Sequence, residues 1–136
     1  MPNLITNKTK GLLSKIVAPT ADYLEFYTVP ASADYTVPVI SVLNTSATAL
    51  TVTILVTKAK TRVGNPASYT LQPDEFIITV PDGYIVAHIT DYIEHDFELA
   101  PSAVLDRQGL AFDSGERFFA KASAGGCVIR LSGIEA

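Results

Sequence analysis

The run from Tyr23 to Lys60 constrains the fold of this chain more than any other segment. In its last part, Leu50, Val52, Ile54 and Val56 alternate with Thr51, Thr53, Leu55 and Thr57. A period of two residues, rich in β-branched side chains, is typical of a half-buried strand. We therefore predict a strand with an inward apolar face and an outward face lined by threonines, as in an antiparallel sheet.

Two turn-like breaks divide the same run into three predicted strands. Pro30–Asp34 separates Leu24–Val29 from Val37–Leu43, and Asn44–Thr48 separates the latter from the alternating strand. Pro, Asn, Asp and Ser each favour turns for a specific backbone reason. We predict that the three strands form a β-meander, in which each strand lies beside the next one along the chain.

Strand-like segments continue through the rest of the sequence, after a loop at Thr61–Ala67. We expect further strands at Ser68–Leu71, Glu75–Val80, Tyr84–Ile89, Leu110–Phe112, Phe118–Ala122 and Cys127–Ile134. We also expect a turn at Pro81–Gly83 and hairpin turns at Ser114–Gly115 and Ala124–Gly126. Asp91–Ala103 is the least regular segment and has room for one helical turn before Pro101 ends it. About eight or nine strands with frequent turn signals are typical of a sandwich or barrel.

Length and composition limit the possible classes of protein. With 136 residues, 48% of them hydrophobic and 18% charged, the chain suits one ordered domain with some apolar surface left for an interface. Its net charge of −4 and ten scattered basic residues argue against nucleic acid as a partner. Its single cysteine excludes a disulfide framework. Lysines interrupt the N-terminal apolar residues, so we expect cytoplasmic synthesis without membrane insertion.

The residue types that carry chemistry form no recognisable catalytic signature. His88, Asp91, Glu94, His95 and Asp96 include types that bind divalent cations, but an irregular acidic loop of this kind is usually solvated. Cys127 alternates with Ile129 and Leu131, which favours a small buried apolar residue over a nucleophile. No nucleophile elbow, phosphate-binding loop or dinucleotide fingerprint occurs in the sequence. We predict a non-enzymatic protein without a cofactor.

Two blocks of sequence resemble a known class of proteins. Phe26–Val56 reads FYTVPASADYTVPVISVLNTSATALTVTILV, and Asp113–Glu135 reads DSGERFFAKASAGGCVIRLSGIE. The first block resembles small virion proteins of tailed bacteriophages, in which a strand ends in a "YTVPA" turn and the next strand runs into "NTS". The second resembles the end of the same proteins, which close with "SGIE". The two blocks span less than half of the chain.

The resemblance implies an all-β protein, an antiparallel jelly-roll-like β-sandwich, that is a structural component of a phage particle. We expect a capsid decoration (cement) protein in the virion that binds the major capsid protein or another virion protein. A homotrimer is expected from the resemblance and from the apolar residues on both faces of Val37–Leu43. The alternatives are a neck, tail or fibre accessory protein, a carbohydrate-binding adhesion module and, more distantly, a hydrolase.

Two segments of opposite charge are the candidate interface. Residues 1–20 are interpreted as an N-terminal arm and residues 21–136 as the sandwich domain. The candidate interface residues are Lys8, Lys10 and Lys15 on the arm and Asp91, Glu94, Asp96 and Glu98 on the acidic segment. Opposite charges on such segments steer two surfaces together. Two alternatives stay open: the arm reaches a partner, or it packs on its own domain and completes its sheet.

Overall fold

The computed structural model describes residues 11–20, 22–58, 62–63, 65–80 and 83–136. Within these residues the protein is all-β, and every paired strand is antiparallel to its neighbours. Sheet A contains β1 (Gly11–Val17), β12 (Cys127–Glu135), β3 (Tyr35–Asn44), β9 (Val104–Arg107) and β10 (Phe112–Asp113). Sheet B contains β2 (Leu24–Thr28), β11 (Arg117–Ala122), β4 (Leu50–Thr57) and β8 (Tyr92–Leu99). Sheet C contains β5 (Arg62–Val63), β7 (Gly83–His88) and β6 (Glu75–Val80).

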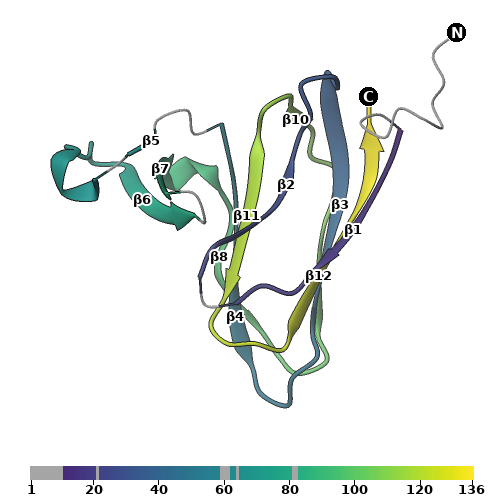
Figure 1. Ribbon diagram of the computed structural model, residues 1–136. Helices are drawn as coiled ribbons and strands as arrows, with labels where there is room; N and C mark the ends of the chain where they lie inside the picture. The colour runs from purple at the N-terminus through teal and green to yellow at the C-terminus, as the bar shows by residue number, and fades with distance from the viewer. Residues whose placement is uncertain (1–10, 21, 59–61, 64, 81–82) are drawn as a thin grey trace, which may run out of the picture.

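Sheets A and B pack face to face and form a β-sandwich, while sheet C lies on the side of sheet B that is turned away from sheet A (Figure 1). The predicted antiparallel sandwich is therefore confirmed. Its jelly-roll character stays a prediction.

The predicted β-meander is wrong. β2 pairs with β11, β3 pairs with β12, β9 and β10, and β4 pairs with β11 and β8. β2, β3 and β4 therefore do not pair with one another. Both breaks instead carry the chain from one sheet to the other. A turn motif in the sequence indicates that the chain reverses direction, but it does not indicate which sheet the next strand joins.

The predicted C-terminal hairpins are wrong for the same reason. β11 belongs to sheet B and β12 to sheet A, so the turn at 124–126 crosses the sandwich. Gly126 is needed there, because its φ is +103° and an added Cβ would lie 2.7 Å from the Cβ of Ser46. The turn at Ser114–Gly115 likewise joins β10 of sheet A to β11 of sheet B.

Two further segments differ from their predicted structure. Ser68–Leu71, predicted as a strand, is not a strand: Ser68 is the last residue of a short 3₁₀ helix, η1 (Pro66–Ser68). The side chain of Asn65 caps η1 by accepting a hydrogen bond from the backbone N–H of Ala67. Much of the segment predicted to be irregular is β8, which follows a second 3₁₀ turn, η2 (Ile89–Asp91). Parts of the predicted loop at 61–67 and turn at 81–83 lie outside the described residues.

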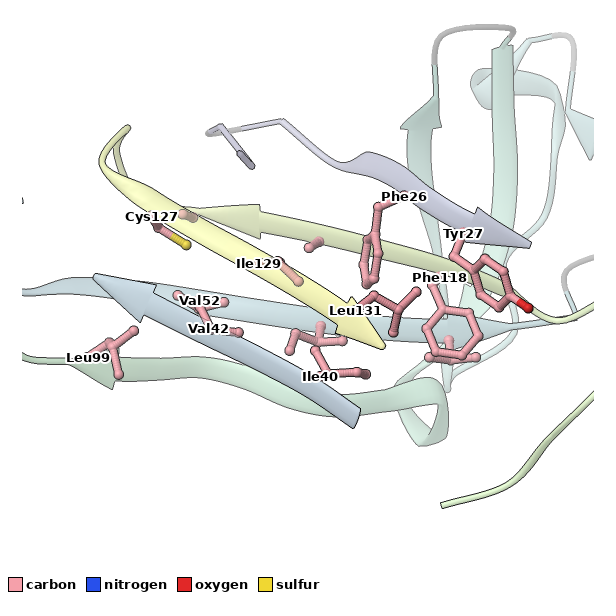
Figure 2. Close-up of a cluster of buried hydrophobic side chains, with 14 of the residues drawn as sticks. Phe26, Tyr27, Ile40, Val42, Val52, Leu99, Phe118, Cys127, Ile129 and Leu131 are labelled. Atoms are coloured by element: carbon pink, nitrogen blue, oxygen red, sulfur yellow. The ribbon is translucent and has the colours of Figure 1, made fainter. Parts of the chain in front are cut away.

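One apolar core fills the space between sheets A and B. Phe118 stands at its centre, with Phe26, Tyr27 and Phe112 packed edge-to-face against it at ring-centroid distances of 5.9, 5.3 and 4.8 Å. The inward residues of β12 complete it from the opposite sheet, as Figure 2 shows for Cys127, Ile129 and Leu131. The inward orientation predicted for these three residues is confirmed by their burial.

A second, smaller core joins sheet C to the outer face of sheet B. It consists of Leu55, Ile78, Ile85, Ala87 and Phe119, all buried. β4 is consequently buried on both faces over most of its length. On the face predicted to meet solvent, Thr51 is partly exposed, but Thr53 and Thr57 are only 1% and 3% exposed. The hydroxyl of Thr53 accepts a hydrogen bond from the backbone N–H of Asp96 in place of water.

The described part of the predicted arm belongs to sheet A. β1 pairs along its whole length with β12, from Gly11 opposite Glu135 to Val17 opposite Ile129. The arm was expected either to reach a partner or to complete the sheet of its own domain, and residues 11–17 complete the sheet of their own domain. Residues 1–10 lie outside the described residues.

Candidate functional site

The outer face of sheet A carries much of the exposed apolar surface of the described protein. We call this surface the A-face and define it by the outward residues of β3, β9 and β12: Tyr35, Val37, Val39, Ser41, Leu43, Val104, Asp106, Val128, Arg130, Ser132 and Ile134. Val104 and Ile134 are 56% and 55% exposed, and Tyr35 is 46% exposed. Soluble domains rarely gather large apolar side chains on one face unless that face binds something.

The A-face forms because β3 alternates along its whole length. Its residues at even positions from Thr36 to Asn44 are buried, whereas Tyr35, Val37 and Leu43 are exposed despite being apolar or aromatic. The apolar character of both faces was visible in the sequence of this strand. The contribution of β9 was not, because no strand was predicted at residues 104–107.

Two of the four acidic candidate residues have structural roles. Asp91 accepts a hydrogen bond from the backbone N–H of His88 at 2.9 Å and so caps the η2 turn. Glu94 lies 3.4 Å from the guanidinium nitrogen Nε of Arg107, and this ion pair joins β8 of sheet B to β9 of sheet A. These two carboxylates are therefore used within the fold.

The other two acidic residues flank an exposed aromatic side chain on the edge strand β8. Asp96 has a φ of +50° and interacts through its backbone and carboxylate with Thr53, while its Oδ2 lies 3.5 Å from Nε2 of His95. Glu98 is exposed and has no partner among the described residues, and Phe97 between them is 39% exposed. We call Asp96, Phe97 and Glu98 the β8 edge.

The basic candidates do not lie beside the acidic ones in the described part of the chain. Lys8 and Lys10 lie outside the described residues. Lys15 lies on β1, opposite Leu131 of β12, and nothing is described of its side chain. β1 is the edge strand of sheet A on the side of β12, and the Glu94–Arg107 pair places β8 beside β9 at the other side of β3. The backbone of Lys15 and the β8 edge therefore lie at opposite sides of the sandwich.

The histidines pair separately with nearby acids. His88 lies 3.5 Å from Asp74 and 3.8 Å from Glu75, on sheet C and the turn before it. His95 stacks on Tyr92 with ring centroids 4.2 Å apart. Among the described residues no group of three or more His, Cys, Asp or Glu side chains could hold a metal ion.

Cys127 lies in the main core, where it is 1% exposed. Burial raises the pKa of its thiol above the ordinary value, which disfavours the thiolate that a nucleophile requires. No base is hydrogen-bonded to it among the described residues, and its neighbours are the apolar side chains of the core. The arrangement suits packing rather than catalysis.

Two shallow grooves on the outer side of sheet B share Lys121 and were not predicted. The first, of about 200 Å³, is lined by Thr51, Thr53, Asp96, Lys121, Ala122 and Ser123. The second, of about 230 Å³, runs between Tyr23 and β6, and the Lys121 ammonium lies 4.8 Å from the centre of the Tyr23 ring. Nothing in the sequence signalled these grooves, because each one is lined by residues that are far apart in the chain.

Comparison with known proteins found no matching family model, no matching curated protein and no matching solved structure. Within the residues that the structure describes, no helix has the length and apolar character needed to cross a membrane.

Proposed function

We propose that this chain is a non-enzymatic structural protein of a tailed-phage virion, and that it decorates the capsid by binding its outer shell. The observation that carries the proposal is the β8 edge, where the exposed side chains of Phe97 and the two acids lie on the outermost described strand of sheet B. The resemblance of the two sequence blocks to small phage virion proteins gives the class of particle.

The β8 edge is the proposed contact with the capsid protein. Edge strands offer unpaired backbone groups, and here the exposed Phe97 adds an apolar contact, while Asp96 and Glu98 add acidic ones. A basic strip on the capsid protein is the complementary surface. Because such rim charges are screened by salt, binding should weaken as ionic strength rises.

The mechanism is stabilisation by binding. A protein that binds the assembled lattice more tightly than free capsid subunits adds its binding free energy to the stability of the lattice. A subunit that contacts two neighbouring capsid proteins opposes their separation directly. No covalent chemistry is needed for this role.

Co-sedimentation with purified capsids that lack this protein tests the proposal. We expect saturable binding to assembled capsids, release as NaCl rises, and little binding to unassembled capsid protein. Glu98→Lys should weaken capsid binding about tenfold, equivalent to ~1.4 kcal/mol, whereas Asp34→Lys, which reverses an exposed charge on another part of the surface, should not. Failure to bind assembled capsids at any salt concentration would exclude capsid decoration.

A carbohydrate-binding adhesion module is the second candidate, favoured by the polar grooves around Lys121. The hydroxyl, carboxylate and ammonium groups there suit the hydroxyls of a sugar. Screening the protein against an array of bacterial surface glycans distinguishes the two functions. Specific glycan binding that Lys121→Ala abolishes would favour the adhesion module.

A further inference from the structure

The middle of the A-face holds one acid and one base in a single row across three strands. Ser41 of β3 is the register partner of both Arg130 of β12 and Asp106 of β9, so the three side chains share one face. The Ser41 hydroxyl donates a hydrogen bond to Asp106. Arg130 is exposed and has no partner among the described residues, and Asp106 has no cationic partner among them. The backbones of these two residues are two strands apart, about 10 Å, and no ion pair joins their side chains in the described protein.

Apolar rows flank this charged row on both sides. Towards one end of the sheet, Leu43 of β3 lies between Val128 of β12 and Val104 of β9. Towards the other end, Val37 pairs with Ile134. Along the strands, the A-face thus has an apolar row, a row with separated opposite charges, the mixed row of Val39 and Ser132, and a second apolar row, in that order.

We propose that the A-face binds the A-face of a second copy of this chain, about a two-fold axis parallel to β3. That rotation keeps each row at the same position along the strands, and it places β12 of one copy opposite β9 of the other. Arg130 of each copy then lies opposite Asp106 of the other, which forms two equivalent ion pairs. Val128 lies opposite Val104 by the same operation. Such an isologous contact is the commonest arrangement of homo-oligomers.

The charge pattern selects this axis over the other two-fold axis that lies in the contact plane. Rotation about an axis perpendicular to the strands would keep β12 opposite β12, and Arg130 would then meet Arg130 of the second copy. Like charges brought together in an interface cost several kcal/mol. The apolar rows supply the area to be buried, while the Arg130–Asp106 pairs fix the register and orientation.

The A-face is small compared with a standard interface. Its three strands, about 4.8 Å apart and about 3.3 Å long per residue, give a face of roughly 15 by 30 Å. Standard protein interfaces bury about 800 Å² on each partner, so we expect a modest pair whose formation depends on concentration. Sheets packed in this way lie nearly aligned, as the two layers of a sandwich do.

The inference goes beyond the proposed function, because it concerns the purified protein without a capsid. It also replaces the homotrimer expected from the resemblance with a two-fold pair. In that pair the two β8 strands point to opposite sides, so one pair would present two β8 edges to two neighbouring capsid proteins.

Charge reversal on the row tests the inference. The molar mass of the purified protein is measured by sedimentation equilibrium over a range of concentrations, and we expect twice the monomer mass. Arg130→Asp places two acids opposite each other at both contacts, and Asp106→Arg places two bases there, so each variant alone should pair at least about 100-fold more weakly. An equimolar mixture of the two variants should restore the pair, because every contact again joins Asp to Arg.

A matched control reverses a charge on the opposite outer face. Lys121→Asp lies on sheet B and should leave the molar mass unchanged, and circular dichroism checks that all variants are folded. A monomer at every concentration, a trimer, or a dimer that neither Arg130→Asp nor Asp106→Arg weakens would overturn the inference. Failure of the mixture to pair when each variant is a folded monomer would also overturn it. None of these outcomes depends on whether the protein binds capsids.

Discussion

Neighbouring phenylalanines on β11 offer a matched test of the two cores. Phe118 and Phe119 are both fully buried, but Phe118 points into the main core and Phe119 packs with Leu55, Ile78 and Ile85 beneath sheet C. If the second core holds sheet C on the sandwich, Phe119→Ala should destabilise sheet C more than the rest of the protein. Phe118→Ala should instead destabilise the whole sandwich.

The expected loss is large compared with the stability of a small domain. Removing a buried phenylalanine side chain costs about 3–5 kcal/mol, from lost apolar transfer energy and the cavity that remains. A domain of this size is stable by about 5–15 kcal/mol in total. The smaller second core has fewer buried partners to absorb the loss, so the free energy of opening sheet C should fall towards zero in Phe119→Ala.

Native-state hydrogen exchange measures both effects residue by residue. Amides of β6 and β7 should exchange much faster in Phe119→Ala than amides of β12, whereas in Phe118→Ala all three strands should lose protection together. Equal loss of protection in β7 and β12 of Phe119→Ala would refute the separate role of the second core. A loss below about 1 kcal/mol anywhere would refute the packing argument itself.

Four further changes have expected outcomes. Thr53→Asp should cost about 3–5 kcal/mol in chemical denaturation, because it buries an uncompensated charge beside the Asp96 carboxylate; a neutral effect would mean that this face is wet. Cys127→Ala should lower the melting temperature modestly and leave assembly intact, whereas rapid labelling of the native thiol by a maleimide would contradict its burial. Burial, together with a hydrogen bond to Glu135, raises the pKa of the Tyr27 hydroxyl above its ordinary value of 10.0. The proton is therefore held more tightly in the folded state, so stability is complete below pH 10 and falls as the pH rises above it, and Tyr27→Phe should make that alkaline fall shallower. Deleting residues 1–16 should lower the melting temperature, because it removes nearly all of β1 from β12, and an unchanged melting temperature would contradict the pairing of β1.

Local strand formation could be predicted from the sequence, because it depends on the alternation of side chains. The burial of Ile54 and Cys127 and the strands at 24–28, 35–44 and 50–57 follow directly from that pattern. The partner of each strand could not be predicted, because sheet crossing depends on contacts between residues far apart in the chain. Thr53 is the clearest case, since the residue that hydrogen-bonds to it, Asp96, lies 43 positions further along the chain.

The acidic segment was misread as irregular because two of its carboxylates, those of Asp91 and Glu94, are used within the fold. Asp91 caps the η2 turn, and Glu94 is held at the side of the sandwich by Arg107, so β8 can carry three acids without being a solvated loop. The charged row of the A-face was missed as well. Arg130 and Asp106 are 24 positions apart in the sequence, and they lie in one row only because β12 and β9 both pair with β3.

Imaging of phage particles with and without this protein tests the central claim most directly. Cryo-electron microscopy of the two preparations should differ by density on the outer surface of the capsid, repeated at a symmetry position of the lattice. The particles that lack the protein should also release their DNA at a lower temperature. Difference density confined to the neck, tail or fibres, or absent from the particle, would contradict capsid decoration.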